Sequence, residues 1–276
     1  MARKRLFCEL GPTAYKISLM RQILKRHLSN LFSSEKFAVA RSKEPLKEVG
    51  SCISGCMIKR GPGINPELQI NKAENIRLAC SKINGLIINP GETFSFWKIV
   101  GRTSRKNGFL DGRILMNGKL VSGIGGGLCN LANSLHMVVM NSPMTVTELH
   151  HHSDALAPDE GGVRKPYSAG TSVNYNFIDF RFRNDTKDRI QLMTYCVDEN
   201  LTVELRTEKP FSESYRIVEE DHHFTKDEKG CYFRKSKIYR ETIDKETGQL
   251  KKRELKWDNK SKVMFDPSLI PNEEIR

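Results

Sequence analysis

A run of glycines followed at once by an apolar helical repeat is the feature that most constrains how this chain can fold. The segment Gly125-Gly126-Gly127 lets the backbone approach another surface closely and adopt positive φ angles. From Leu128 onward, apolar residues recur at the spacing of one buried helix face until Asn141-Ser142-Pro143 ends the pattern. The sequence therefore predicts a helix of about three turns, with Cys129 in its first turn.

The position of Cys129 allows two interpretations. Unpaired N–H groups and the positive end of the helix dipole favour an anion at a helix N-terminus, which lowers the pKa of a cysteine there and makes it nucleophilic. Cysteine is also among the most buried residue types, so Cys129 can equally be a small packing element beside the glycines. The spacing alone leaves both interpretations open.

Composition favours a soluble globular protein. The chain has 276 residues, of which 38% are hydrophobic, and its mean hydropathy is −0.49. No apolar run is long enough to predict a membrane-spanning helix, and Glu9, Lys16 and Arg21 interrupt the apolar core that a signal peptide needs. The seven cysteines are odd in number and widely scattered, so we expect reduced thiols and a cytoplasmic location.

Positive charge is concentrated near the N-terminus. The formal net charge is +12, and residues 1–60 contain thirteen Lys and Arg against four Glu. Within this region apolar residues keep helical spacing from Ile17 to Leu31, with Lys16, Arg21, Lys25 and Arg26 between them. Such a basic amphipathic helix can lie on an anionic membrane surface, or it can pack on the core with a solvated charged face. No nucleic-acid-binding motif accompanies the charge, and we expect no nucleic-acid partner.

Short patterns outline the rest of the fold. Residues 33–66 mix turn formers with short apolar groups and predict a connector with little regular structure. Beyond it we expect a helix over 71–84, a buried strand at 86–88, core aromatics at Phe94, Phe96 and Trp97, and a hairpin turning at Asn117-Gly118. After the cysteine helix, strands are predicted at 145–149, 171–183, 189–197 and 201–207, followed by a long charged hairpin.

These elements predict an α+β fold, in which an antiparallel sheet packs with the cysteine-bearing helix. We expect three regions. Residues 1–60 form the basic helix and connector, residues 61–210 form the core, and residues 211–276 form a charged β-hairpin extension whose lysines protect an exposed edge.

A cysteine hydrolase or acyl transferase is one functional hypothesis. Cys129 would be the nucleophile, and the base would come from the three histidines that end the 145–149 strand, with His152 preferred. Asp179 would orient the imidazole, and N–H groups of the glycine run would form an oxyanion hole. Helix-borne cysteine first and strand-borne histidine next is the order of the papain, transglutaminase and NlpC-type hydrolases. His136 lies two turns from Cys129, about 10.5 Å along the helix, which is too far for a hydrogen bond.

A binding module without catalysis is the second hypothesis. In it the glycine run and neighbouring polar residues shape a surface for a ligand or a partner, and the candidate contacts are Gly125, Gly126, Gly127, Asn130, Glu92 and His150. A metal site at Cys129 and the histidines is the third hypothesis, but no fourth ligand is evident. We therefore predict no metal and no cofactor.

Several spaced motifs together resemble the VanW family. They are Pro90-Gly91-Glu92-Thr93-Phe94-Ser95-Phe96, the segment Gly125 to Cys129, His151-His152-Ser153, and the run from Asp179 to Thr186. The chain differs from the family pattern at two positions. Asn130 stands where the family usually has Gln, and Gly170 stands where longer members have Asp.

The resemblance implies an accessory protein of glycopeptide (vancomycin) resistance or cell-envelope metabolism. The partner expected from this context is a cell-wall precursor or an anionic membrane surface. We favour a ligand- or partner-binding role, with hydrolysis or acyl transfer on peptidoglycan-type amides as the alternative. If the Asp of longer family members is a triad residue there, only Asp179 or Asp154 can replace it in this chain.

Overall fold

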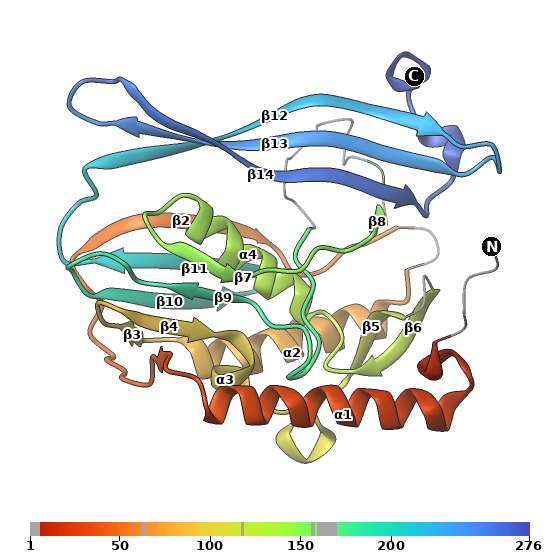
Figure 1. Ribbon diagram of the computed structural model, residues 1–276. Helices are drawn as coiled ribbons and strands as arrows, with labels where there is room; N and C mark the ends of the chain where they lie inside the picture. Colours follow the sequence, from red (N-terminus) through yellow and green to blue (C-terminus); the bar gives the residue numbers. More distant parts are fainter. Residues whose placement is uncertain (1–5, 62–63, 117–118, 156–157, 159–169) are drawn as a thin grey trace.

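The computed structural model describes residues 6–61, 64–116, 119–155, 158 and 170–276 (Figure 1). Within these residues the predicted α+β class is confirmed by α-helices that pack with mainly antiparallel sheets. The α-helices are α1 (Pro12–Leu31), α2 (Pro66–Ile83), α3 (Phe96–Val100) and α4 (Leu128–Met140). Short 3-10 helices occupy Phe7–Glu9, Arg105–Asn107, Pro267–Leu269 and Asn272–Glu274.

Four sheets surround these helices. Their neighbouring strands are antiparallel except for the parallel pairs β1–β4 and β14–β8. One sheet has the spatial order β1 (Lys36–Phe37), β4 (Glu92–Ser95), β9 (Arg181–Arg183) and β7 (Thr145–Glu148). The core sheet has the order β2 (Glu48–Cys56), β11 (Asn200–Thr207), β10 (Ile190–Val197) and β3 (Leu86–Ile88). The C-terminal sheet has the order β12 (Glu213–Lys226), β13 (Tyr232–Asp244), β14 (Leu250–Val263) and β8 (Asp154–Ala155), and β5 (Asp111–Met116) pairs with β6 (Lys119–Ile124).

The cysteine-bearing helix α4 is the central element of the core. It begins where the glycine run predicts, and Gly127 precedes it with a φ of 102°. Leu131, Leu135 and Val138 are fully buried, and the helix packs on α2, β2 and β11. Near its other end, Met140 joins an apolar cluster with residues of the β12–β14 sheet. α4 therefore contacts both the core sheet and the C-terminal sheet.

Helix α2 confirms the helix predicted at 71–84 and begins five residues earlier. Asn65 caps it by accepting a hydrogen bond from the Leu68 N–H, and Pro66 occupies its first turn, where no N–H partner is needed. Ile76 and Ile83 are fully buried against β10. The predicted core aromatics Phe94, Phe96 and Trp97 are also buried.

The expectation of little regular structure over residues 33–66 is wrong. The nine-residue strand β2 lies in this segment and pairs with β11 along its length, for example Ile53 with Val203. β2 has few large apolar side chains, so its strand conformation depends on hydrogen bonds to a neighbour 150 residues away. A pattern within β2 alone does not reveal this pairing.

The strand predicted over 171–183 is also wrong for most of its length. Only Arg181–Arg183 forms a strand, and Asn174 pairs across a tight turn with Ile178. Asn176, in that turn, has a φ of 46°, which is incompatible with an extended strand. The turn separates segment 170–173, which contacts α4, from β9, which pairs with β4 and β7.

The predicted charged hairpin is confirmed as β13 and β14, in which Phe233–Ile243 pairs antiparallel with Leu250–Lys262. The structure adds β12, which pairs antiparallel with β13 and which the sequence reading did not include. Figure 1 shows this sheet, coloured blue, lying across the molecule on the side opposite α1. The sheet thus covers the C-terminal end of α4.

The glycine run packs backbone against backbone. A Cβ placed on Gly126 would lie 2.2 Å from the carbonyl carbon of Gly112, which belongs to β5. The Gly126 carbonyl also accepts a hydrogen bond from Asn75 Nδ2 at 3.0 Å. Close approach of two chain segments therefore requires glycine at both 112 and 126.

We predict that Gly126→Ala lowers the free energy of unfolding by at least about 2 kcal/mol, because a methyl group there must displace backbone. Urea unfolding measures the change. Gly55→Ala is the control, since a Cβ on Gly55 meets nothing within 4 Å, and its effect should stay within about 0.5 kcal/mol. Equal stability of the two variants would contradict this account of the glycine run.

Candidate functional site

Three polar side chains form a stripe along α4 and face one extended segment. Cys129 Sγ accepts a hydrogen bond from the Val173 N–H at 3.5 Å and lies 3.6 Å from the Val173 carbonyl. Asn133 Oδ1 accepts from the N–H groups of Gly170 and Thr171 at 3.1 and 3.2 Å. His136 Nδ1 lies 3.1 Å from Thr171 Oγ1. Segment 170–173 is thus held along the helix by side chains one turn apart.

The environment of Cys129 opposes ionisation of its thiol. The side chain is half-buried and packs against the main apolar core. Burial raises the pKa of Cys129, and the Val173 N–H only partly offsets this. The shift is opposite to that expected for a reactive cysteine at a helix N-terminus.

The backbone of the three histidines pairs with segment 170–173, and the His151 ring reaches α4, with its centroid 6.4 Å from that of His136. The Ser172 N–H donates to the His150 carbonyl at 2.8 Å, and the His152 N–H donates to the Gly170 carbonyl at 2.9 Å. Segment 170–173 therefore pairs antiparallel with the histidine segment on one side and is hydrogen-bonded to side chains of α4 on the other. Among the described residues, Cys129 Sγ makes hydrogen bonds with the Val173 backbone and none with an imidazole, so the predicted pairing of Cys129 with His152 is not seen there.

Each histidine has its own surroundings. His150 Nε2 lies 3.1 Å from Glu148 Oε1. The His151 ring stacks on Trp257 of β14 at a centroid distance of 4.1 Å and an angle of 5°. Burial lowers the pKa of His152, which Asp154 partly opposes, and burial lowers the pKa of His136 to about 3. His136 is therefore a neutral imidazole at physiological pH.

Gly170 lies in the wall that this stacked pair forms. A Cβ on Gly170 would be 3.1 Å from the Trp257 ring and 3.5 Å from His151 Nδ1. The position where longer family members have Asp is thus closely covered by an indole from the C-terminal sheet.

The hydrogen-bond partners of Asp179 differ from the histidine that it was predicted to orient. Its carboxylate is buried and accepts hydrogen bonds from Ser95 Oγ at 2.6 Å and from Arg181 Nε at 2.8 Å. It also accepts from the N–H groups of Trp97 and Phe180, and so caps α3. None of these partners is one of the three histidines, because the turn at Asn174–Ile178 separates Asp179 from segment 170–173.

Most of the other residues predicted to contact a ligand form hydrogen bonds with nearby parts of the chain. The N–H groups of Gly125 and Gly126 donate to the carbonyls of Leu110 and Gly123, so neither points to an open oxyanion hole. Glu92 accepts from the N–H and the side chain of Asn89 at 2.9 and 3.1 Å and closes the turn before β4. Asn130, in the first turn of α4, is half-buried. In the described part of the chain, no cluster of three His, Cys, Asp or Glu residues could hold a metal ion.

A buried lysine lies beneath the N-terminus of α4. Lys72 of α2 is 9% exposed, and its side chain packs on Gly127, where a Cβ would lie 2.2 Å from Lys72 Cγ. Burial, together with the nearby cations Lys59 and Arg113, lowers the pKa of Lys72 from its ordinary 10.5 to about 8. This amine was not among the sequence-based candidates.

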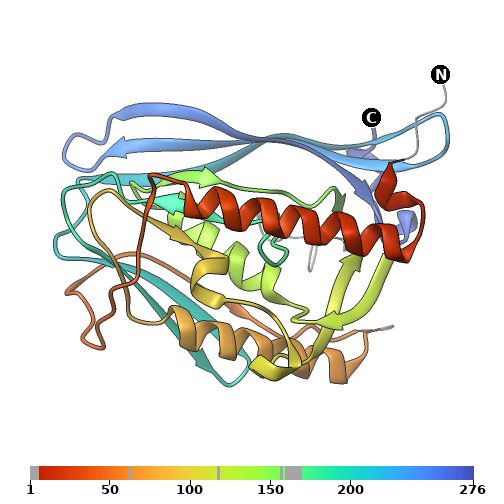
Figure 2. The same ribbon diagram turned by 60° about the horizontal axis from the view of Figure 1, so that its bottom comes forward.

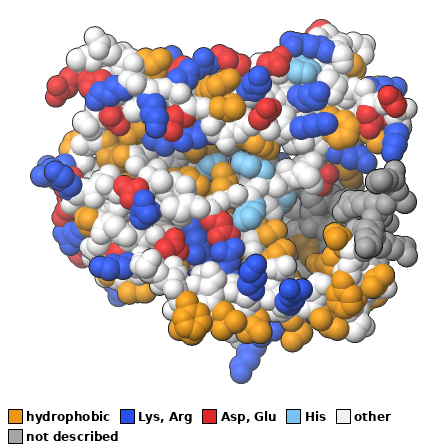
Figure 3. All heavy atoms as spheres, in the orientation of Figure 1, with side chains coloured by type: hydrophobic (Ala, Val, Ile, Leu, Met, Phe, Trp, Pro, Cys, Tyr) orange, Lys and Arg blue, Asp and Glu red, His pale blue; other side chains and the backbone are white. Residues whose placement is uncertain are grey.

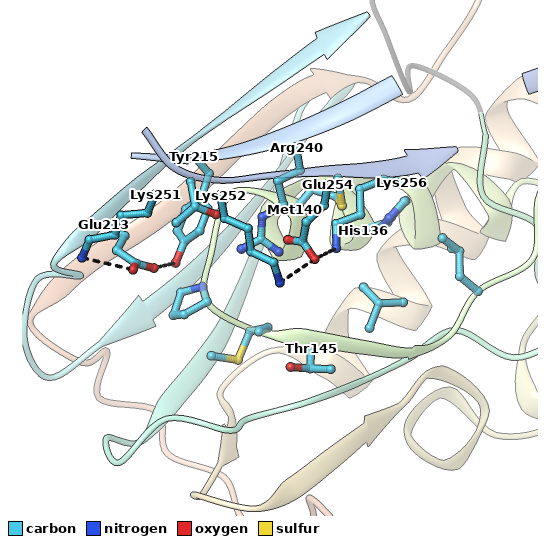
Figure 4. A pocket seen from close by; sticks show the side chains of 15 residues that line it. His136, Met140, Thr145, Glu213, Tyr215, Arg240, Lys251, Lys252, Glu254 and Lys256 are labelled. Atoms are coloured by element: carbon cyan, nitrogen blue, oxygen red, sulfur yellow. Dashed lines mark hydrogen bonds and ion pairs between the residues drawn. The ribbon is translucent and has the colours of Figure 1, made fainter. Parts of the chain in front are cut away.

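A cleft of about 700 Å³ opens between α4, the segment leading into β7, and the β12–β14 sheet (Figure 4). This basic cleft has an apolar floor and a charged wall with four cations and two carboxylates. Its lining residues are His136, Met140, Pro143, Met144, Thr145, Val146 and Leu149 below, and Glu213, Tyr215, Arg240, Thr242, Lys251, Lys252, Glu254 and Lys256 above.

Arg240 differs from the other cations of the basic cleft. Lys252 and Lys256 share Glu254 at 2.9 and 3.2 Å, whereas no carboxylate of the described residues pairs with Arg240. Arg240 is 8% exposed, donates to the Ser142 carbonyl at 2.6 Å and lies over the Tyr215 ring at 4.2 Å, while its buried Nε has no partner. A buried guanidinium without a counter-charge favours an anion.

Sequence reading missed most of this site for two reasons. Cys129, Asn133 and His136 recur at i, i+4 and i+7, a spacing that places three polar side chains on one face of the helix and that indicates a polar partner there. The basic cleft has no such signal, since it exists only because the C-terminal sheet packs on α4.

A family model described as "VanW like protein" matches residues 71–206, from α2 to β11, including the α4 stripe and segment 170–173. The chain is also 29% identical over 205 residues to the vancomycin B-type resistance protein VanW of Enterococcus faecalis (strain ATCC 700802 / V583). Residues 71–206 therefore resemble the VanW family. The alignment with that VanW family relative covers 74% of this chain and 73% of the relative.

A second VanW family comparison is shorter. The chain is 28% identical over 114 residues to the uncharacterized protein YoaR of Bacillus subtilis (strain 168), an alignment of 41% of this chain and 36% of the relative. No solved structure matches the chain significantly.

We predict that Asp179→Ala lowers the free energy of unfolding by about 3–5 kcal/mol, because it removes the nearest carboxylate of the buried Arg181 and leaves Ser95 Oγ and the Trp97 and Phe180 N–H groups without this acceptor. Urea unfolding followed by circular dichroism measures the loss. Glu199→Ala removes an exposed partner of Arg60 instead and should cost under about 1 kcal/mol. A stable Asp179→Ala protein would contradict the structural role.

The lowered pKa of Lys72 predicts that the free energy of unfolding rises at alkaline pH. Its pKa is lower in the folded chain, so the unfolded chain binds more protons between pH 8 and 10.5, and stability increases with pH across that window. At pH 7, Lys72→Met should raise the free energy of unfolding by about 2 kcal/mol and remove most of this slope. Lys43→Met, at an exposed lysine, is the control. Identical pH slopes in wild type and Lys72→Met would count against the buried amine.

Proposed function

We propose that this VanW-like protein is an accessory binding protein of glycopeptide resistance or cell-envelope metabolism, which takes an anionic cell-wall precursor in the basic cleft. The observation that carries the proposal is Arg240, a buried guanidinium on the cleft wall with no carboxylate partner among the described residues. An anionic group of a ligand would supply the missing charge and accept from Nε.

The shape of the basic cleft suits an amphipathic anion. Its volume of about 700 Å³ lies in the range of small-molecule sites. Met140, Met144 and Val146 offer apolar contact in the cleft, and Figure 4 shows Arg240 of the C-terminal sheet near Met140. Cell-wall precursors combine these features, since they carry phosphate or carboxylate groups beside apolar or peptide portions.

The state of Cys129 supports binding over catalysis. Its sulfur is hydrogen-bonded to the Val173 backbone, burial raises its pKa, and segment 170–173 pairs with the backbone of the histidine segment. A nucleophile needs a base within hydrogen-bond reach, and no imidazole contacts this thiol. The context comes from the relative named as a vancomycin B-type resistance protein.

The test is calorimetric titration of the full chain with a nucleotide-linked muramyl peptide as the probe. We expect saturable binding that weakens about 10- to 100-fold in Arg240→Gln, because a charge-assisted hydrogen bond to a buried group is lost. Lys237→Gln is the matched control, since it removes one positive charge from the same strand at an exposed position outside the cleft. Equal affinity of Arg240→Gln and wild type, or no binding by wild type, would overturn the proposal.

The same samples test the hydrolase alternative. Mass spectrometry of the incubated probe should show no cleavage, and iodoacetamide should alkylate Cys129 more slowly in the native than in the unfolded protein at pH 7. Cleavage that disappears in Cys129→Ser would establish the enzyme instead.

A further inference from the structure

Helix α1 carries a continuous apolar stripe that no described part of the protein covers. No residue of the helix is buried. At 100° per residue the stripe spans about 80° of the helix surface. The exposed fractions along it are Ile17 52%, Met20 70%, Leu24 60%, Leu28 48% and Leu31 74%.

The stripe continues beyond both ends of the helix. Phe32 follows at 82% exposed, and Phe7 and Leu10 precede it at 54% and 62%. Figure 3 shows hydrophobic side chains gathered along the lower edge of the molecule, where Figure 1 places α1. This area is larger than the scattered apolar residues normal on a monomer surface.

The opposite face of α1 is fixed to the body by charged groups. Arg26, about 160° from the stripe on the helix, donates to both oxygens of Glu148 at 2.6 and 2.5 Å. Asn30 accepts from Arg181 at 2.7 Å, and Arg181 also pairs with Glu35 at 3.0 Å. Figure 2 shows α1 lying across the outside of the molecule. The stripe is therefore held facing outward.

The charges that flank the stripe identify what covers it. Lys16, Arg21 and Lys25 lie beside the stripe, and no carboxylate of the described residues pairs with them. The helix itself contains no Asp or Glu. Two copies of α1 packed stripe to stripe would bring these cations together, whereas an anionic lipid surface would neutralise them.

We propose that α1 is a membrane-docking helix that lies in the interface of a bilayer containing anionic phospholipids. The apolar stripe inserts among the upper acyl chains, and Lys16, Arg21 and Lys25 contact the phosphates. No helix in the described part of the chain is long and apolar enough to cross a membrane. The proposal does not depend on the basic cleft, because that cleft is lined by α4 and the C-terminal sheet.

Vesicle sedimentation tests the proposal. We expect the full chain to bind vesicles of equal parts phosphatidylglycerol and phosphatidylcholine at least ten-fold more strongly than pure phosphatidylcholine vesicles. Leu24→Glu should weaken this binding at least ten-fold. Leu255→Glu is the matched control, since Leu255 is 51% exposed on β14 and outside the stripe, and it should bind as wild type does. Both leucines are solvent-exposed, so both variants should fold normally.

Two further measurements complete the test. Tryptophan emission of Met20→Trp should shift to shorter wavelength on the anionic vesicles, because the ring enters the acyl region. Arg240→Gln should bind vesicles normally, so failure of the cleft and failure of the helix are distinguishable. Absence of vesicle binding, equal binding by Leu24→Glu, or a vesicle-free dimer that Leu24→Glu dissociates in ultracentrifugation would overturn the proposal.

Discussion

The arrangement of this protein depends on how α4 satisfies its polar side chains inside the core. The helix is enclosed by α2, the core sheet and the C-terminal sheet, so Asn133 and His136 need hydrogen-bond partners that are not water. They find them in segment 170–173, which is also bonded to the histidine segment on its other side. That single stretch of backbone connects α4 to β8 and therefore to the C-terminal sheet.

The same segment determines the surroundings of Cys129 and His136. Cys129, the first member of the stripe, meets the backbone of Val173 where a hydrolase would need an imidazole. His136 lies on the correct helix face but bonds to Thr171 and is neutral. Cys129, Asn133 and His136 thus hold segment 170–173 along the helix, and Gly126 makes the close backbone contact with Gly112.

How much could be predicted from the sequence depended on how local each signal was. The glycine run and the apolar repeat predicted the position of α4, because helix faces are set by neighbours in the chain. The start of α2 was predicted five residues late, because the capping pair Asn65-Pro66 was assigned to the connector. β2 and the turn at Asn176 were missed, since one depends on a distant strand and the other on a left-handed residue inside an apolar run. The exposed stripe of α1 was visible as a pattern, but only the structure shows which way it faces.

Position 170 and the C-terminal sheet share one small volume. Gly170 leaves room for the indole of Trp257, which stacks on His151 directly above it. A side chain at 170 and a large ring at 257 cannot both occupy that space without one moving. In the VanW family the two positions should therefore covary. A carboxylate at position 170 should be accompanied by a smaller residue at position 257, or by the absence of the C-terminal sheet.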